Sequence, residues 1–127
     1  MLTHDELESL AKHFLDAWNS QEVETILACY TDDLVYRDPN TRGSVIGSDN
    51  MRRYLTKLLS AWSMTWSLRE IHAFRDSNGA AVLWHATFSR AGRESRVEAD
   101  GMDFIALRGR LACRNEVYFD RVVLSAL

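Results

Sequence analysis

The stretch Tyr30–Pro39, YTDDLVYRDP, determines how the rest of the chain is arranged. Two consecutive acids near its start predict a turn that ends a helix, and the alternation from Leu34 to Asp38 predicts a short strand. Pro39 lacks a backbone N–H and favours extended backbone in the residue before it, so the strand should end at Asp38. Asp38 is therefore expected at a fixed position, on the same face of the strand as Tyr36.

Three helices are predicted around this strand. The first begins with a capping box formed by Thr3 and Glu6 and continues, with apolar residues at spacings of three and four, to about Asn19. A serine that can cap a helix precedes each of the other two. The predicted helices are residues 3–19, then 21–29 after Ser20 and 49–61 after Ser48, with a polar loop at 40–47.

The second half of the chain is predicted to be sheet. From Met64 onward the apolar pattern becomes alternating, with many β-branched and aromatic residues. The order predicts an α+β domain with three N-terminal helices packed in the concavity of a strongly curved, mostly antiparallel sheet, a cone with a mouth. The predicted strands are residues 65–74, 80–91, 96–107 and 111–120, with hairpin turns between them.

Parts of these strands are apolar on both faces, as in Ala81–Trp84. A sheet that carries helices on one face only would leave its other apolar face exposed to water. A second copy of the chain is the simplest cover. The sequence therefore predicts a homodimer through the outer face of the sheet.

The composition excludes several classes of function. The 127 residues are expected to form one domain, 1–127, and the net charge of −3 provides no basic surface for nucleic acid. Cys29 and Cys113 show no CxxC or Cys/His spacing, so the sequence indicates no metal site and fits a reducing cytoplasm. The polar start of the chain and the lack of a long apolar run predict neither secretion nor a membrane span.

The order of these features resembles that of the nuclear transport factor 2-like superfamily, in particular the ketosteroid isomerases and the SnoaL-like polyketide cyclases. The resemblance is carried by Tyr30-Thr31-Asp32-Asp33, by Asp38-Pro39, by Gly47 before the third helix and by the late segment GMDFIALRGRLACRNEVYFD. It covers essentially the whole chain and implies a cone without a cofactor. Because ketosteroid isomerase has its general base in a matching Asp-Pro pair, the resemblance implies that role for Asp38.

Two departures from ketosteroid isomerase accompany this resemblance. The tyrosine on the first helix of that enzyme corresponds here to Phe14, and its protonated aspartic acid on the fourth strand corresponds to Met102. The isomerase needs both donors to stabilise a dienolate. Steroid isomerisation by the same route is therefore not expected of this chain.

A second carboxyl group is expected in the cone beside Asp38. The parity implied by the resemblance turns Asp100 inward, whereas a bulge at Gly101 would bring in Asp103 instead. Two carboxyl groups in one cavity would divide into an acid and a base. Asp100 is therefore a candidate catalytic residue, with the choice between it and Asp103 left open.

Hydroxyl and guanidinium groups provide the remaining candidates. Tyr54, followed by Tyr36, is expected to orient a substrate carbonyl, unless the hydroxyl only ties a buried ring to the backbone. Arg114 is a candidate for binding an oxygen, although an ion pair with Glu116 is the commoner outcome. The substrate-binding wall is predicted to comprise Phe14, Trp18, Tyr36, Trp84, Phe88, Met102, Phe104, Arg114 and Tyr118, with no metal ligand.

The leading functional prediction is an isomerase, cyclase or dehydratase without a cofactor. It would act on a small apolar, cyclic carbonyl compound through acid–base proton transfer by Asp38. The alternative is a non-catalytic small-molecule-binding or dimeric interaction domain, since an aromatic cone can bind a ligand without catalysing a reaction. Trp62 and Trp66, near the end of the third helix, are expected to contribute packing only.

Overall fold

A computed structural model describes all residues of the chain, from 1 to 127. It contains three α-helices, six strands and a C-terminal 3-10 helix. The helices are α1 (His4–Asn19), α2 (Val23–Leu27), α3 (Ser48–Ala61) and η1 (Arg121–Ala126). The strands are β1 (Tyr30–Arg37), β2 (Val45–Ile46), β3 (Trp62–Ala73), β4 (Gly79–Arg90), β5 (Arg96–Arg108) and β6 (Leu111–Tyr118).

The strands form a single mixed sheet in the order β2-β1-β6-β5-β4-β3. From β3 to β6 each strand pairs antiparallel with the next, whereas β1 pairs parallel with β6. Register shifts interrupt β3 between Leu68 and Glu70 and β5 between Ala106 and Leu107, and such irregularities bend long strands. The sheet does not close, because β2 and β3 remain at its edges. The predicted α+β architecture with a curved, mostly antiparallel sheet is confirmed.

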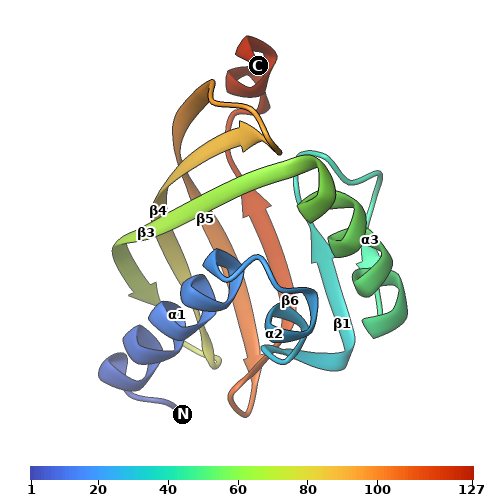
Figure 1. Cartoon of the computed structure of the whole chain (residues 1–127). Helices are drawn as coiled ribbons and strands as arrows, with labels where there is room; N and C mark the ends of the chain where they lie inside the picture. Colours follow the sequence, from blue (N-terminus) through green and yellow to red (C-terminus); the bar gives the residue numbers. More distant parts are fainter.

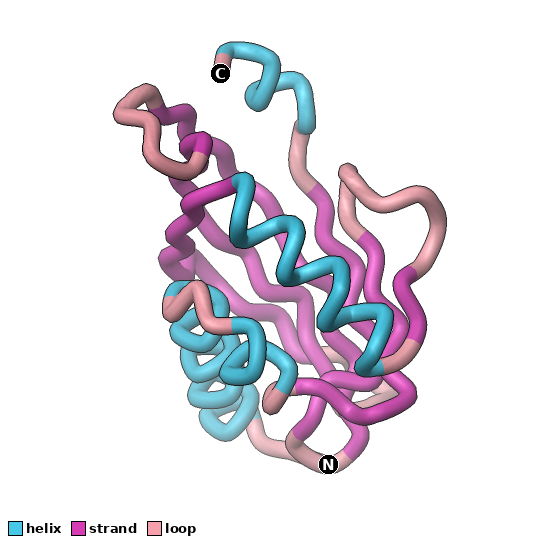
Figure 2. Tube along the Cα trace, turned by 45° about the vertical axis from the view of Figure 1, so that its right-hand side comes forward, coloured by secondary structure: helices cyan, strands magenta, loops and turns pink.

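The α-helices lie on one face of this sheet (Figures 1 and 2). α1 crosses β3 and buries Leu7, Phe14 and Trp18 against the concave side. Its capping box is present as predicted: Thr3 Oγ1 accepts from the N–H of Glu6 at 3.1 Å, and Glu6 Oε1 accepts from the N–H of Thr3 at 3.0 Å. None of the helices is long and apolar enough to cross a membrane.

The turn predicted at Asp32 and Asp33 is not present, and these residues are part of β1. Tyr30 pairs with Ala112 of β6, and the carbonyl of Cys29 accepts from the N–H of Ala112 at 2.8 Å. The register of β1 against β6 then shifts between Tyr30 and Val35, so Asp32 and Asp33 lie in an irregular part of the strand with exposed side chains. The two acids interrupt the pairing without ending the strand.

Both predicted serine caps were wrong. Glu22 is the N-cap of α2 and makes no side-chain cap bond, while Ser20 donates its hydroxyl to a carbonyl of α1. Ser48 lies inside α3, and Gly47 is the N-cap with a φ of +83°. Gly47 occupies this left-handed conformation readily because it lacks a Cβ, and its N–H donates to the carbonyl of Leu34 at 2.9 Å.

Two short elements were not predicted. Residues of the expected loop form β2, in which Ile46 pairs with Val35 of β1. After β6 the chain forms η1, where the side chain of Asp120 accepts from the N–H of Val122 at 3.0 Å. Both are too short for a hydrophobic period to reveal them.

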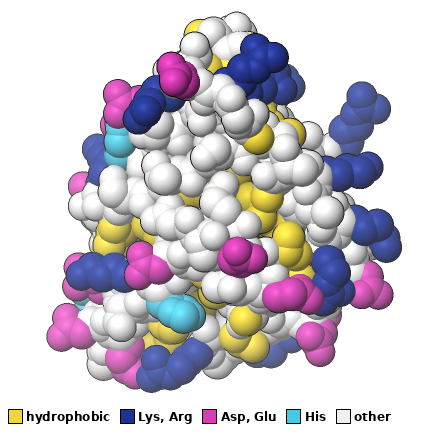
Figure 3. Space-filling view, viewed as in Figure 1, with side chains coloured by type: hydrophobic (Ala, Val, Ile, Leu, Met, Phe, Trp, Pro, Cys, Tyr) yellow, Lys and Arg dark blue, Asp and Glu magenta, His cyan; other side chains and the backbone are white.

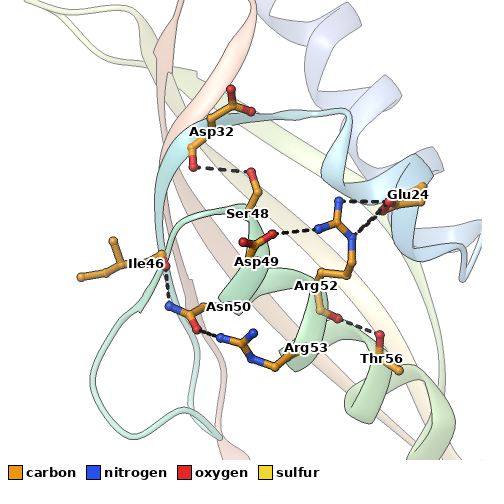
Figure 4. A network of polar contacts seen from close by, with 9 residues as sticks. All are labelled: Glu24, Asp32, Ile46, Ser48, Asp49, Asn50, Arg52, Arg53 and Thr56. Atoms are coloured by element: carbon orange, nitrogen blue, oxygen red, sulfur yellow. Dashed lines mark hydrogen bonds and ion pairs between the residues drawn. The ribbon is translucent and has the colours of Figure 1, made fainter.

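Polar contacts at the start of α3 connect it to α2 and β1 (Figure 4). The guanidinium of Arg52 binds both carboxylate oxygens of Glu24, at 3.1 and 3.2 Å, and also Asp49 at 3.2 Å. The Ser48 hydroxyl donates to the backbone carbonyl of Asp32 at 3.4 Å. These groups are exposed, so each ion pair adds little stability, but together they fix where α3 begins relative to β1.

Gly101 is expected to be intolerant of a larger side chain. A Cβ at this position would lie 2.4 Å from Cη2 of Trp84 and 2.7 Å from the carbonyl oxygen of Tyr118. We predict that Gly101→Ala lowers the free energy of unfolding by about 1–3 kcal/mol in urea titrations, because the indole ring must move. The same change should cost less in a Trp84→Phe background, and an equal cost in both backgrounds would contradict the proposed clash.

Candidate functional site

A narrow cavity opens between the concave face of the sheet, α1, α3 and η1. The space between its lining atoms, including solvent at its open end, is about 590 Å³. All four tryptophans of the chain line it. The lining residues are Leu15, Trp18, Tyr36, Asp38, Asn40, Leu58, Trp62, Met64, Trp66, Trp84, Phe88, Asp103, Asn115, Val117, Phe119 and Leu124.

Aromatic contacts hold this wall in place. Trp18 stacks on Tyr36 with ring centroids 5.9 Å apart, and Phe88 stacks on Phe119 at 5.2 Å. Trp66 meets Trp84 edge to face at 6.4 Å. Such pairs restrict each other's rotation, so the wall is a preformed apolar surface.

Asp38 lies directly after β1 and presents its carboxylate to this cavity. Oδ1 accepts hydrogen bonds from the backbone N–H groups of Asn40 at 2.7 Å and Thr41 at 3.1 Å, which form an Asx-type turn. Oδ2 accepts from the hydroxyls of Tyr36, at 2.7 Å, and Tyr54. Four donors therefore fix the carboxylate in one orientation.

The two tyrosines act on Asp38 as donors. Burial, followed by the negative charge of Asp38, raises the pKa of Tyr36 well above its usual value and has the same effect on the pKa of Tyr54. Both hydroxyls therefore keep their protons at neutral pH. Tyr36 lines the cavity, whereas Tyr54 reaches Asp38 from α3 and is not among the lining residues.

Asp103 is the second carboxyl group of the cavity, and its surroundings are the opposite of those of Asp38. It is 5% exposed and makes no hydrogen bond to a backbone or hydroxyl donor. Burial raises its pKa to about 7; the neighbouring Trp84 indole N–H opposes the rise, and the charge of Asp38 adds to it. Up to neutral pH, Asp103 therefore carries a proton that it can donate.

In β5 the residues that face inward are those on the side of Asp103, not those on the side of Asp100 as the resemblance implied. β4 and β5 pair in unbroken register, with Val82 opposite Asp103 and Trp84 opposite Gly101. Directly opposed residues share a face, and Val82 and Trp84 are buried on the concave side. No bulge at Gly101 is involved. Met102, matched above to the aspartic acid of ketosteroid isomerase, faces outward, and the buried acid is the next residue.

Asp100 lies on the outer face of the sheet, so its expected place in the cavity was wrong. Its Oδ1 is 2.8 Å from Nδ1 of His85, whose Nε2 is 2.9 Å from Glu98. Arg69 is 3.7 Å from the other oxygen of Asp100. Hydrogen bonding to His85 lowers the pKa of Asp100, and the two acids raise the pKa of His85. This is an exposed charge cluster with no access to the cavity.

Four predicted wall residues also lie on the outer face: Met102, Phe104, Arg114 and Tyr118. The guanidinium of Arg114 lies 4.5 Å above the ring of Phe104, and its Nε donates to Glu116 at 2.6 Å. Tyr118 is 51% exposed and donates to the same carboxylate at 2.5 Å. The Arg114–Glu116 pair named as the commoner outcome is confirmed, and these residues do not belong to the cavity wall.

Phe14 lies in a different cavity, at the opposite end of α1. This cavity of about 800 Å³ is lined mainly by apolar residues of α1, β4 and β5, among them Leu7, Val82 and Ile105. The ring of Phe14 packs edge to face on Tyr30 with centroids 5.5 Å apart. Trp18, Tyr36, Trp84 and Phe88 are the predicted wall residues that the structure does bring together with Asp38.

Several cavity residues were missed. Trp62 and Trp66, expected only to pack, line the cavity on either side of buried Met64. The spacing of two from Trp62 to Met64 and from Met64 to Trp66 was a signal that all three share a face. Asn115 and Phe119 also share a parity, but nothing in the sequence of β6 indicates that this parity is the inward one.

Trp84 carries an unused donor in this cavity. Its Nε1 is fully buried and has no hydrogen-bond partner in bonding geometry, although it lies near enough to Asp103 to influence its pKa. Buried donors are seldom left unpaired in folded proteins, so such a group is an indicator of a ligand acceptor. The arrangement offers one fixed base, one buried acid and one unpaired donor around an apolar cavity.

The fold corresponds to that of a known class of protein, the nuclear transport factor 2-like proteins. The putative isomerase from Bacillus subtilis is similar in structure, with a TM-score of 0.86 and 11% identity over 99% of this chain and 94% of that one. The epoxide hydrolase/cyclase-like enzyme SalBIII, of pyran ring formation in the polyether salinomycin, gives a TM-score of 0.83 and 17% identity over 97% of each chain. A ketosteroid isomerase-like protein from Erwinia carotovora atroseptica gives 0.72 and 19%, over 91% and 94%.

The family is established by the sequence itself. The family model for the SnoaL-like domain matches residues 11–115, and the chain belongs to this family. No curated protein matches the sequence significantly. The predicted family membership is thus confirmed, while the structural neighbours, all below 25% identity, show the fold alone.

The buried acid predicts a specific pH dependence of stability. The pKa of Asp103 is about 7 in the folded protein and near 3.8 in the unfolded chain, so the folded state retains a proton that the unfolded state releases. Stability should therefore fall as pH rises from about 4 to about 7. Between pH 5 and pH 8 we expect Asp103 alone to lower the free energy of unfolding by about 2–3 kcal/mol.

Urea unfolding at these two pH values checks this prediction. The Asp103→Asn variant should lack this part of the pH dependence, because asparagine has no proton to release. Other titrating groups, such as His85, are common to both proteins and cancel in the comparison. Equal pH dependence in wild type and variant would show that Asp103 is not the group responsible.

Proposed function

We propose that this protein is an isomerase- or cyclase-type enzyme that moves a proton within a small apolar, cyclic carbonyl compound and requires no cofactor. The observation that carries this proposal is the pair of carboxyl groups in one aromatic cavity, Asp38 surrounded by donors and Asp103 buried without them. Environments that separate two acids in this way assign one as base and the other as acid.

Asp38 is the proposed general base. Asp38 lines the cavity, its Oδ2 accepts from the hydroxyls of Tyr36 and Tyr54, and these hydroxyls stabilise the carboxylate between turnovers. A substrate carbon next to a carbonyl would lose its proton to this carboxylate. The carbonyl group then becomes an enolate, and its negative charge moves to oxygen.

Asp103 and Trp84 are the proposed donors to that oxygen. The protonated carboxyl of Asp103 and the unpaired indole N–H of Trp84 are neighbours on facing strands, so one substrate oxygen can accept from both. Donors arranged in advance for a developing oxyanion typically contribute hundredfold or greater effects. If a C=C bond extends the enolate, return of the proton from Asp38 to its far carbon completes an isomerisation. If the enolate carbon instead attacks a second carbonyl of the same molecule, a C–C bond forms, and the alkoxide produced takes the proton held by Asp38, which completes a cyclisation.

The comparisons support this class of reaction. One structural neighbour is named a putative isomerase and another an epoxide hydrolase/cyclase-like enzyme. Those names describe those proteins, and the carboxyl pair described above provides the argument for this chain. The unpaired state of Cys29 and Cys113 fits the reducing cytoplasm in which we place the activity.

Hydrogen exchange tests the proposed proton transfer without knowledge of the product. In D2O, the protein should accelerate loss of the α-proton NMR signals of an apolar cyclic ketone such as 2-tetralone. Asp38→Asn should lower this rate by about a hundredfold or more, the usual contribution of a general base. Asp100→Asn, which alters an outward-facing acid of the same type, is the matched control and should retain the wild-type rate.

Exchange no faster than in buffer, or equal rates for wild type and Asp38→Asn, would exclude the proposed chemistry. Calorimetric binding of the ketone without exchange would instead support the alternative, a non-catalytic small-molecule-binding protein.

We also propose that a second copy covers the outer face of the sheet. Leu83, Met102 and Phe104 lie half-buried on this face, and Tyr118 is 51% exposed beside them. Sedimentation velocity should show a dimer at micromolar concentration. Met102→Glu should convert it to a monomer, because a charge would replace an apolar contact, whereas Met102→Leu should not; a monomeric wild type would contradict this arrangement.

A further inference from the structure

We infer that the substrate carries a carboxylate in addition to its apolar carbonyl portion, and that Arg90 and Arg121 bind this carboxylate at the mouth of the cavity. The inference deepens the proposed function and rests on this cavity being the substrate site. It is carried by an open hollow of about 720 Å³ that shares three residues with the cavity, Asn40, Trp62 and Leu124. Because these residues line both spaces, a ligand in the cavity can extend into the hollow.

Arg90 is held over the mouth by an aromatic ring. It lies at the end of β4, and its guanidinium carbon is 4.4 Å from the centroid of Trp62, a lining residue of the cavity. Such stacking fixes the plane of the guanidinium while leaving its N–H groups free at the edge. The side chain is exposed and lines the hollow. Arg90 therefore presents donors at the point where a ligand would leave the tryptophan wall.

Arg121 lines the same hollow from a different element of the fold. It is the first residue of η1, and its Nε donates to Oδ1 of Asn40 at 2.7 Å. The backbone N–H of Asn40 in turn donates to Asp38. Arg121 is thus connected to the proposed base through one residue, and the terminal nitrogens of its guanidinium have no hydrogen-bond partner in the structure. A carboxylate bound there would lie close to the reacting end of the site.

Neither arginine has a carboxylate partner within the protein. Six arginines lie within 4.0 Å of an acid, whereas Arg90 and Arg121 do not. They share this property with Arg42, Arg53, Arg75, Arg93 and Arg96, but only Arg90 and Arg121 also line the hollow. Asp120, which precedes Arg121 in the sequence, accepts a hydrogen bond from the backbone N–H of Val122. Lys and Arg side chains stand at the end of the molecule that carries the C-terminus, with a few acids among them (Figure 3). Arg90 and Arg121 thus place two positive charges without an acidic partner around the hollow.

The shape and charge of the site together define the ligand. The narrow aromatic cavity accepts a flat apolar portion, Asp103 and Trp84 face its carbonyl oxygen, and the arginines face an anion at its outer end. A guanidinium matches a carboxylate by forming two parallel hydrogen bonds. An apolar keto acid satisfies all three requirements, whereas a neutral ketone leaves the guanidinium groups of Arg90 and Arg121 without an anionic partner.

Matched probes test this inference by calorimetry. At about 20 mM NaCl, 2-naphthoate should bind about three- to tenfold more tightly than 2-acetonaphthone, a neutral compound of similar shape, and the difference should shrink at about 300 mM NaCl. Arg90→Gln and Arg121→Gln should each weaken 2-naphthoate about threefold and leave 2-acetonaphthone unchanged. Arg75→Gln, an exposed arginine in the β3–β4 turn, is the control and should change neither.

Each other outcome overturns the inference. If 2-acetonaphthone binds as tightly as 2-naphthoate, or if the preference survives in the Arg90→Gln/Arg121→Gln double variant, the arginines do not recognise an anion, and the proposed function stands without them. If both variants weaken both probes equally, their effect is on the shape of the mouth. If neither probe binds the wild type, the cavity is not a ligand site, and the proposed function fails together with this inference.

Discussion

The alternation of side chains across β4 and β5 is the constraint on which the site depends. Val82 and Trp84 are buried against the helices, and the unbroken register carries that choice to Gly101 and Asp103. A shift by one residue would exchange every inward side chain for an outward one. The cavity would then hold a methionine where it now holds an acid. Burial of one large tryptophan thus decides which carboxyl group can take part in chemistry.

The two carboxyl groups differ because the backbone treats them differently. Asp38 follows the end of a strand, where Pro39 stops the ladder and the next N–H groups turn back toward the side chain. Asp103 lies in the middle of a strand, where the ladder already uses the backbone N–H groups, so none remains to solvate its side chain. Asp38 at the strand end therefore has backbone donors for its carboxylate, whereas Asp103 inside the strand has none, and burial raises its pKa.

Much of the fold could be predicted from the sequence, because it depends on periodicity and caps. The capping box at Thr3, the apolar face of α1 and the change to alternation after Met64 each have one physical meaning, and the elements appear where expected. The prediction failed where the sequence pattern fits either face of a strand equally well as the inward face. In Glu98–Asp103 an acid occurs on either parity, so only the pairing with β4 could separate Asp100 from Asp103. The partner of β1 was equally hidden, since a parallel contact with β6 leaves no local signal.

The energetic cost of Asp103 is an argument for a role in function. A carboxyl group that is 5% exposed, with no backbone or hydroxyl donor, costs stability compared with an apolar residue of similar size, and the cost grows as pH rises toward its pKa of about 7. The Trp84 indole N–H beside it is a second buried polar group, and it has no partner other than this neighbouring carboxyl. Two buried polar groups with only each other as partners in a largely aromatic wall are hard to explain by folding, which would be served better by leucine or phenylalanine. Groups that destabilise the empty fold and would gain partners from a bound oxygen are the arrangement expected of a site organised around a ligand.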